Sequence, residues 1–251
     1  MEALFLGSDG QQVFAAYHPA AATGTRPLTV ICPPLFMVEY IRSHLALRQL
    51  AISLAENGYP VLRFDYRGTG DSFGDIGDVS MSDWLEDTDL ALREGLELSG
   101  SSKVRLLGVR AGALVACRFA GRCKDIERVI LWDPVLDGPA YLESLRHIQT
   151  QILERDLDLS PSERRETAHE YGGQRLSAGM LLELRALNAS AFASVRKDNW
   201  YVVTTSSQPD FAVHGVAGRR VDFGCGWETD FQNVMTPKPV LEHLAECLTM
   251  L

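Results

Sequence analysis

An α/β domain built on a mostly parallel sheet is the fold class that the sequence predicts. Short apolar runs rich in β-branched residues alternate with longer segments of helical periodicity along the chain. In the first cycle, residues 28–32 form an apolar run that ends at Pro33, and residues 43–56 carry an apolar helical stripe that stops at Asn57-Gly58. Strands joined by crossover helices lie parallel, and the ligand sites of such sheets form at the carboxyl ends of the strands.

Later parts of the chain repeat this cycle with one interruption. Strands are expected over 61–65, 104–108, 129–132, 200–205 and 219–223, and helices over 82–98, 111–122 and 239–250. Ser82 is expected to cap the first of these helices. Residues 137–198 are polar and mostly helical, and Ser160-Pro161-Ser162-Glu163 has the pattern of a helix start. We therefore expect a single domain over 1–251 with a helical cap inserted at 137–198.

The composition is that of an ordinary globular protein. Of the 251 residues 46% are hydrophobic and 23% are charged, and the formal net charge of -9 repels nucleic acid and anionic lipid. The five cysteines are scattered, with no CxxC pair and no spacing that suits a zinc site. No apolar run approaches ~18 residues. We therefore expect a cytoplasmic protein with reduced thiols, no membrane span, no metal, no cofactor and no nucleic-acid partner.

The turn after the strand at 104–108 has the frame of a nucleophile elbow, whose usual pattern is Gly-x-Ser-x-Gly. Gly108 and Gly112 stand two positions either side of its centre, where strand and helix approach closely and a Cβ would clash. The central residue is Arg110. Its guanidinium has no nucleophilic lone pair, so acyl-enzyme chemistry at this position is excluded. Arg110 either binds an anion together with the helix N-terminus, or pairs with a nearby acid and fills the pocket.

The other two members of a serine triad follow the nucleophile in the chain order acid, then base. Asp133 and Asp210, each after a later strand, are the candidates for the acid. The base belongs in the loop after the last strand, which contains no histidine, and Cys225 or Trp227 stands there instead. Two histidines outside this loop are expected at the surface or in the core, His214 and His243.

Backbone amides suited to an oxyanion hole remain in the sequence. One N–H comes from the residue after the nucleophile position, Ala111, and the other from the loop after the strand at 28–32. Proline has no N–H, so the loop residues that can donate are Leu35 and Phe36. These amides can hold a carbonyl oxygen or an anion.

The glycine-rich stretch that begins at Asp65 is interpreted as a stiff turn. Asp65 and Asp71 are expected to accept backbone N–H groups while pairing with Arg67. The stretch lacks the GK[ST] ending of a phosphate-binding loop. Ser72 has no base placed beside it, so the sequence does not favour it as a nucleophile.

Three stretches carry a resemblance to a known family: PPLFMVEYIRSHLALRQLA (33–51), GYPVLRFDYRGTGDSFGD (58–75) and LWDPVLDGPAYLESLR (131–146), which flank LLGVRAGALVA. They resemble the α/β hydrolases named exosortase-A-system-associated hydrolase 2, within the serine-aminopeptidase-like group. The resemblance implies the α/β-hydrolase fold, a pocket of acyl or ester type, and a branch with arginine in the elbow. Its name implies hydrolysis, and the chain departs from active hydrolases at Arg110 and Trp227.

Three functional hypotheses follow. In the first, a protein without serine-hydrolase chemistry binds an anionic or acyl-bearing small molecule, for non-hydrolytic or atypical chemistry. The expected ligand contacts are Leu35, Phe36, Arg110, Ala111 and Trp227. In the second, the chain is a non-enzymatic accessory protein that binds a protein partner in a biosynthetic pathway. The third is an esterase or thioesterase with a non-serine nucleophile.

The second and third hypotheses depend on further residues. An interaction platform predicts exposed apolar side chains on the cap, at Tyr141, Leu142, Leu145 and Ile148. A non-serine esterase would use the thiol of Cys225 or Cys32, or a water molecule activated by Asp133. Arg110, Asp133 and Cys225 are therefore the candidate catalytic residues.

Overall fold

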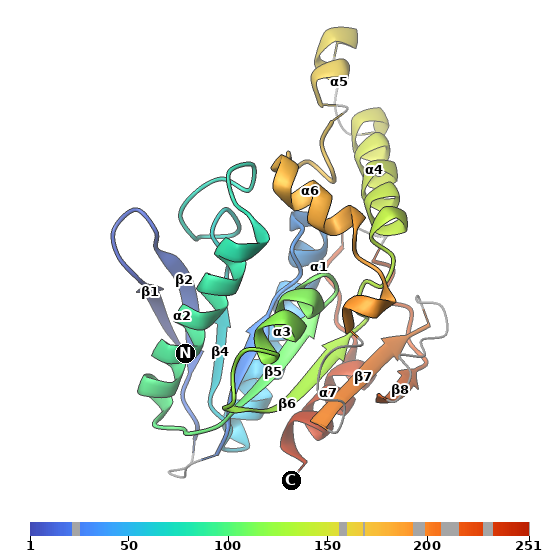
Figure 1. Ribbon diagram of the computed structural model, residues 1–251. Helices are drawn as coiled ribbons and strands as arrows, with labels where there is room; N and C mark the ends of the chain where they lie inside the picture. The colour runs from blue at the N-terminus through green and yellow to red at the C-terminus, as the bar shows by residue number, and fades with distance from the viewer. Residues whose placement is uncertain are drawn as a thin grey trace.

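The computed structural model describes residues 1–21, 26–155, 160–167, 169–192, 199–206, 216–227 and 233–250. Within these residues one sheet has the order β1-β2-β4-β3-β5-β6-β7-β8 (Figure 1). Strands β3 to β8 run parallel, and β2 joins β4 antiparallel, so the predicted mostly parallel sheet is confirmed. The strands are β1 (Glu2–Leu6), β2 (Val13–His18), β3 (Leu28–Cys32), β4 (Val61–Phe64), β5 (Val104–Val109), β6 (Ile126–Trp132), β7 (Trp200–Thr205) and β8 (Ala217–Val221).

Helices cover both faces of the sheet, with α2 and α3 on one face and α1 and α7 on the other (Figure 1). Successive residues of β5 point to opposite faces, so Leu106 joins the core beneath α2 and α3 while Leu107 joins the core beneath α1 and α7. Among the described residues, no helix is long and apolar enough to span a membrane. The helices are α1 (Met37–Glu56), α2 (Met81–Ser99), α3 (Gly112–Ala120), α4 (Gly138–Arg155), α5 (Pro161–Thr167), α6 (Ala178–Arg185), the 3-10 turn η1 (Ala189–Phe192) and α7 (Lys238–Thr249).

Differences from the predicted elements are confined to their ends and to the N-terminus. Helix α1 begins at Met37 rather than at residue 43, and β8 covers Ala217–Val221 rather than 219–223. The hairpin β1–β2 was not predicted. Strand β1 buries only Leu6 among its residues. Its sequence, EALFL, does not show the alternation of apolar and polar residues that marks a half-buried strand.

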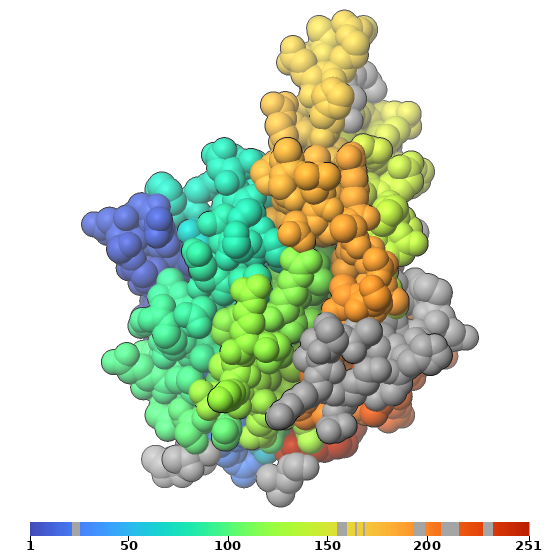
Figure 2. Space-filling model, viewed as in Figure 1, coloured from blue at the N-terminus to red at the C-terminus, as the bar shows by residue number. Residues whose placement is uncertain are grey.

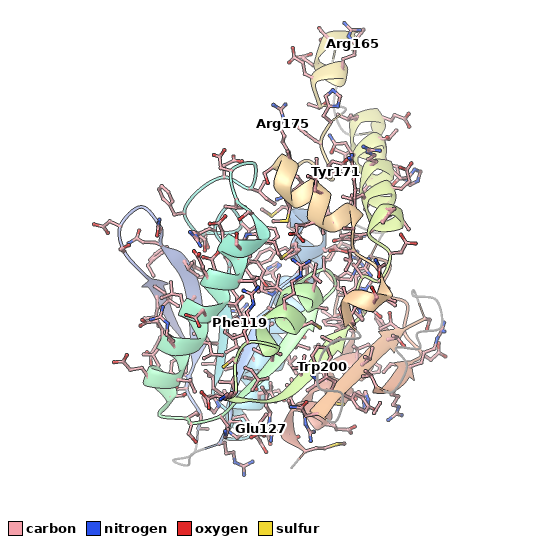
Figure 3. The ribbon with its side chains drawn as sticks, viewed as in Figure 1. Phe119, Glu127, Arg165, Tyr171, Arg175 and Trp200 are labelled. Atoms are coloured by element: carbon pink, nitrogen blue, oxygen red, sulfur yellow. The ribbon has the colours of Figure 1, made fainter. Side chains whose placement is uncertain are left out.

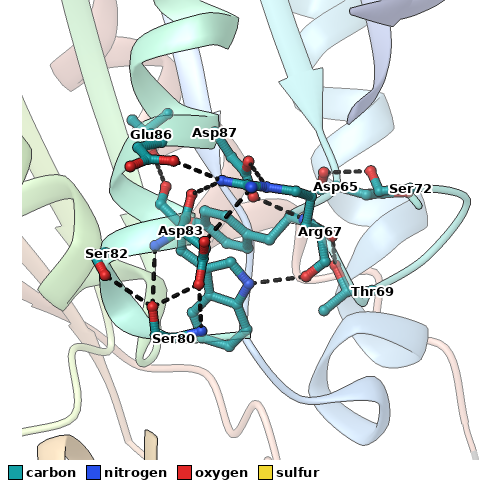
Figure 4. Close-up of polar contacts among 12 residues, drawn as sticks. Asp65, Arg67, Thr69, Ser72, Ser80, Ser82, Asp83, Glu86 and Asp87 are labelled. Atoms are coloured by element: carbon teal, nitrogen blue, oxygen red, sulfur yellow. Dashed lines mark hydrogen bonds and ion pairs between the residues drawn. The ribbon is translucent and has the colours of Figure 1, made fainter. Parts of the chain in front are cut away.

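The N-terminal cap of α2 is Ser80 and not Ser82, which corrects the sequence prediction. The Oγ of Ser80 accepts the N–H of Asp83 (3.4 Å), and Oδ2 of Asp83 accepts the N–H of Ser80 (2.8 Å), as Figure 4 shows. This reciprocal capping box needs an acidic or amide side chain three residues after the cap. Ser80 has Asp83 there, whereas Ser82 has Leu85.

The turn after β4 is stiff as predicted, but its arginine pairs elsewhere. Oδ2 of Asp65 accepts the N–H of Asp71 (3.1 Å), which closes the turn on itself. Arg67 pairs with neither of them and reaches across to helix α2 (Figure 4). The carboxylates that it meets there lie 3.5, 3.2 and 2.5 Å away and belong to Asp83, Glu86 and Asp87. The arginine therefore fastens the turn to the helix.

The expected helical segment lies between β6 and β7 and comprises α4, α5, α6 and η1. These elements lie over the carboxyl ends of the strands, and α5 stands out from the body as a narrow lobe (Figures 1 and 2). The helix start predicted at Ser160 is confirmed, because its N–H donates to Glu163 (2.8 Å) and α5 begins at Pro161.

The apolar patch expected on the outside of this segment is absent from the described surface. Helix α4 packs against α6, and its apolar stripe faces inward because that contact and the body below remove it from water. The prediction of an exposed platform was therefore wrong. All four of its residues are buried, at 1 to 4% exposure: Tyr141, Leu142, Leu145 and Ile148.

Candidate functional site

The turn between β5 and α3 holds Arg110 in the left-handed region, with φ of 53°. A Cβ on Gly108 would lie 2.6 Å from Cα of Ala113, and one on Gly112 would collide with the carbonyl of Pro33. Both glycines are therefore needed for the close approach of strand, helix and neighbouring loop. The predicted strand, tight turn and helix around residue 110 are confirmed.

The side chain of Arg110 is 2% exposed, and the described side chains that it contacts include one acid and two aromatic rings. Its Nε donates to Oε1 of Glu39 (2.6 Å), and its Nη1 donates to the backbone carbonyl of Asp133 (3.2 Å). The guanidinium carbon lies 5.5 Å from the ring centroid of Tyr141 and 5.4 Å from that of Trp227. Burial alone would lower the pKa of Arg110, but Glu39, together with Tyr141 and Asp133, raises that pKa overall. The cation at the elbow is permanent.

Glu39, which the sequence analysis did not single out, provides the countercharge. It lies in the first turn of α1 and is 2% exposed. Its Oε1 faces Arg110, and its Oε2 accepts the hydroxyl proton of Tyr141 (2.5 Å) from α4. The signal that could have found it is an acid inside the apolar run after Phe36, at a place where a buried carboxylate requires a partner.

Asp133 follows β6 with φ of 44° and is fully buried. Its carboxylate accepts hydrogen bonds from three donors at 2.7 Å each. Two of these are the backbone N–H and the hydroxyl of Thr205, at the end of β7, and the third is Nε1 of Trp227. The carboxylate therefore points to β7 and Trp227, while only the carbonyl of Asp133 faces Arg110.

Arg110, Trp227 and Asp133 thus form one contiguous row, in the order elbow residue, aromatic ring and carboxylate. The indole N–H of Trp227 donates to the acid, as the imidazole of a triad would. Indole carries no basic lone pair, because its nitrogen is a donor only. The row keeps the spatial order of a catalytic triad, with a guanidinium and an indole in the places of the nucleophile and the base and a carboxylate in the place of the acid.

Residues 40–198 match the family described as serine aminopeptidase, S33, over more than half of the chain. The chain belongs to this family. The matched region contains the elbow, Asp133 and all helices of the segment between β6 and β7, whereas Trp227 lies outside it. No curated protein sequence matches the chain.

Solved structures similar to this S33 family member share its α/β-hydrolase fold. The ferulic-acid complex of Est1E from Butyrivibrio proteoclasticus has 18% sequence identity and a TM-score of 0.63, covering 98% of this chain and 96% of that one. The Pyrococcus furiosus esterase PF2001 has 15% identity and a TM-score of 0.61, covering 98% and 89%. The thioesterase domain from the curacin biosynthetic pathway has 18% identity and a TM-score of 0.60, covering 100% and 99%. At these identities the likeness shows the fold.

The two cysteines considered as nucleophiles are buried in this S33 family member. Cys225 lies beside Asp133, and its backbone carbonyl accepts a hydrogen bond from Arg42 of α1 (2.5 Å). Burial, followed by the charge of Asp133, raises the pKa of the Cys225 thiol to about 12. Burial likewise raises the pKa of the Cys32 thiol, at the end of β3, to about 12. Neither side chain is a thiolate at neutral pH, which is the form that attacks.

The candidate oxyanion residues lie at the two loops that meet beside Arg110. Leu35 and Phe36 are each 1% exposed, and Ala111 is fully buried as the N-cap of α3. Within the part of the chain that the structure describes, no acceptor faces the N–H of Leu35, Phe36 or Ala111. Their amide protons are therefore available to an acceptor oxygen that enters between the loops.

The remaining candidates do not join this site. Asp210 and His214 lie outside the described residues. His243 lies on α7, where its ring nitrogens face Glu246 (3.2 Å) and the thiol of Cys247 (3.6 Å). In the described ranges no group of three His, Cys, Asp or Glu side chains is placed to hold a metal ion.

Proposed function

We propose that this chain is a non-hydrolytic member of the S33 family that holds an acyl-bearing small molecule without cleaving it. The observation that carries the proposal is Arg110 in the place of the nucleophile, buried and paired with Glu39 at 2.6 Å. A guanidinium has no lone pair for attack, and the indole of Trp227 cannot act as the general base. We infer that residues 137–198 form the cap above this site.

The charges around the elbow favour a neutral acyl group over a free anion. An anion placed on Arg110 would also lie beside Glu39, whose carboxylate already neutralises the guanidinium and repels negative charge. A carbonyl oxygen meets no such repulsion, and the N–H groups of Leu35, Phe36 and Ala111 are suited to donate hydrogen bonds to it. The proposed ligand is therefore an ester, thioester or amide.

An esterase with a non-serine nucleophile finds less support. The raised pKa values of Cys225 and Cys32 leave almost no thiolate. Asp133 would have to accept a proton from water, yet its two carboxylate oxygens already accept three hydrogen bonds. We therefore rank this alternative below non-hydrolytic binding.

Turnover and covalent labelling test the loss of chemistry. We expect p-nitrophenyl acyl esters to be hydrolysed no faster than in buffer, and a fluorophosphonate probe to leave the chain unlabelled. The matched variant is Arg110→Ser with Trp227→His and Glu39→Gln, which supplies a hydroxyl and an imidazole beside Asp133 and removes the unpaired carboxylate. Wild-type turnover well above buffer, or a labelled side chain, would refute the proposal.

A thermal-shift series tests the ligand class. N-acyl cysteamine thioesters of several chain lengths are compared with free carboxylates of the same lengths, because a ligand that binds only the native state raises its Tm. We expect the thioesters to raise the Tm and the carboxylates to leave it unchanged. A rise in Tm with the carboxylates alone would favour anion binding. No rise in Tm with either class would rule out the proposed acyl ligand.

A second candidate function is that of an accessory protein in a biosynthetic system of the exosortase-A-associated type. It is supported by the resemblance of the three stretches and by the burial of every candidate site residue, which leaves the surface for contacts. The free cysteines fit the reducing cytoplasm that we propose for it. Affinity capture with this chain would then recover a stoichiometric protein partner, and the Arg110→Ala variant would bind the same partner. Capture of no partner would rule out the accessory function.

A further inference from the structure

An open cavity of about 760 Å³ lies on the outer side of α2. Its walls come from the loop between β1 and β2, from α2 and from the end of α3. The two helices lie side by side on the face of the molecule seen in Figures 1 and 2. Arg110 stands directly before α3, whereas the cavity residues 122–124 follow the other end of this helix, which is nine residues or about 14 Å long. Cavities of this volume hold a whole small molecule, so a ligand here would be separate from any at the elbow.

The loop between β1 and β2 and the apolar faces of the two helices give the cavity its shape. Gly7 has φ of 86°, and a Cβ on it would lie 3.1 Å from Cδ2 of Leu90 in α2, so the loop packs directly against that helix. The N–H of Gln11 donates to the carbonyl of Ser8 (3.1 Å), which closes the loop. The apolar lining comes from both helices and joins the core, and it comprises Leu85, Leu90 and Phe119, the last labelled in Figure 3. This lining suits the apolar body of a ligand.

The acids in the lining are all paired with arginines of the same lining. Among the described residues that line the cavity, the acids are Glu86, Asp87 and Asp89. The first two pair with Arg67 at 3.2 and 2.5 Å. The third pairs with Arg93 at 3.0 Å. The negative charges of the cavity are therefore already compensated.

Two further cations of the lining, Arg122 and Lys124, are exposed and follow α3. In the part of the chain that the structure describes, no carboxylate lies within ion-pairing distance of either side chain. The cavity therefore carries two uncompensated positive charges, on a chain whose net charge is -9. A phosphate monoester brings about −1.5 to −2 charges at pH 7 and three acceptor oxygens, which matches two cations, whereas a carboxylate brings one charge.

We propose that this cavity binds a small phosphate monoester, with the phosphoryl group between Arg122 and Lys124 and the apolar body against Leu85, Leu90 and Phe119. A guanidinium binds phosphate oxygens through two parallel N–H bonds, and an ammonium adds a point charge with three donors. This second ligand site does not depend on the acyl binding proposed at the elbow.

The thiol of Cys123, between the two cations in sequence, lines the cavity and reports its occupancy. It is half-buried, whereas the other four cysteines are buried, so a thiol reagent reaches Cys123 first in the folded chain. The experiment measures the rate at which N-ethylmaleimide labels Cys123, assigned by peptide mapping, as phenyl phosphate is added. Three compounds are compared with it: benzyl alcohol lacks the charge, benzoate carries one charge, and inorganic phosphate lacks the apolar body.

The variants are Arg122→Gln and Lys124→Gln, alone and together. The matched control is Lys103→Gln with Lys238→Gln, which removes the same charge at exposed lysines outside the cavity. The rate in each variant is divided by its own rate without phenyl phosphate, because the loss of a neighbouring cation also changes the reactivity of the thiol.

We expect phenyl phosphate to slow the labelling of Cys123 in wild type and in the control, and the three comparison compounds to slow it less. The apparent affinity should fall about threefold for each lost cation and about tenfold for both. No protection at about 10 mM phenyl phosphate would overturn the site. Equal protection by any comparison compound would overturn the phosphate monoester, and an equal loss of affinity in the control would overturn the role of the two cations.

The labelling rate is read at Cys123 and not at the elbow. Phenyl phosphate has no acyl group, so a negative thermal-shift series with thioesters would leave this result unchanged. The site in the cavity and the acyl binding at the elbow therefore fail separately.

Discussion

Two arginines, Arg110 at the elbow and Arg67 in the turn after β4, hold carboxylates at nearly the same distance in different surroundings. The Nε of Arg110 lies 2.6 Å from Glu39, and that of Arg67 lies 2.5 Å from Asp87. The side chain of Arg110 is 2% exposed and, among the described residues, pairs with one acid, whereas that of Arg67 is 13% exposed and pairs with three. The two arginines therefore differ in the partners that each keeps when one carboxylate is lost.

Arg67 keeps two carboxylates and partial contact with water after any single loss, so its charge stays compensated. Among the described residues, the contacts that Arg110 keeps after the loss of Glu39 are the carbonyl of Asp133 and the faces of two aromatic rings. Breaking a buried pair by removing one partner leaves a charge in a medium that cannot solvate it. The elbow pair should therefore respond to substitution far more strongly than the turn cluster.

The largest effect is expected for Glu39→Gln, because it removes the carboxylate to which the buried Nε of Arg110 donates. We expect the free energy of unfolding to fall by about 3–5 kcal/mol in urea titrations. Glu56→Gln, at the exposed end of α1, is the control and should change stability by less than ~0.5 kcal/mol. The double variant Glu39→Gln, Arg110→Met should recover most of the loss. A double variant as unstable as Glu39→Gln would show that the pair does not account for the effect.

The next effect is a dependence of stability on pH at a third arginine, Arg63, which donates to a histidine. Its Nε donates to Nε2 of His18 (3.4 Å). Burial, followed by the charge of Arg63, lowers the pKa of His18 from 6.5 to about 4. The folded state therefore keeps His18 neutral while the unfolded state takes up a proton. Stability is complete above pH 6.5 and falls as the pH drops from 6.5 towards 4, by up to ~3 kcal/mol.

Urea titrations between pH 7.5 and 4 measure this loss in wild type and in His18→Gln, which keeps an acceptor for Arg63. We expect the curve of the variant to be flatter across that window. Parallel curves would mean that His18 is protonated in the folded state as readily as in the unfolded state.

A smaller effect is expected for Asp87→Asn in the turn cluster. Asp87 is 2% exposed and accepts both the N–H and the Nε of Arg67, so the substitution loses one charged bond while the carboxylates of Asp83 and Glu86 remain. The free energy of unfolding should fall by about 1–2 kcal/mol. A loss as large as that of Glu39→Gln would show that the extra carboxylates do not compensate, and the contrast between the two arginines would fail.

The smallest effect is expected for Glu86→Gln. The carboxylate of Glu86 is 72% exposed and lies 3.2 Å from Arg67. Exposed pairs of this kind contribute about 0–0.5 kcal/mol, and that contribution should disappear in 1 M salt. Chemical denaturation at two ionic strengths checks it, with Asp87→Asn measured in parallel.

The sequence was sufficient for the parallel sheet and for the position of Arg110, because both depend on local patterns. Apolar runs, helix stops and a pair of glycines two positions either side of one residue are each read within a short window. The hairpin β1–β2 was not predicted, because an exposed edge strand such as β1 has little alternation of apolar and polar residues.

The partners of the charged residues could not be predicted for a different reason. Glu39 reaches Arg110 across 71 positions, and Gln174 reaches Met37 across 137. Arg67 pairs with the acids of α2 and not with Asp65 and Asp71, which are nearer in sequence. The acids of α2 are the ones that face its side chain across the turn. Such pairings follow from which elements pack together, and a periodic pattern carries no information on that packing.

The ion pair at the elbow also restricts how this chain could acquire a hydroxyl nucleophile at position 110. A serine at position 110 would leave Glu39 with only the hydroxyl of Tyr141 as a partner in a water-excluded place. Each single step from arginine to serine therefore passes through a destabilised intermediate, whichever of the two residues changes first. Under the proposed non-hydrolytic function, the arginine at this elbow is therefore hard to replace, because either substitution alone leaves a buried charge with fewer partners.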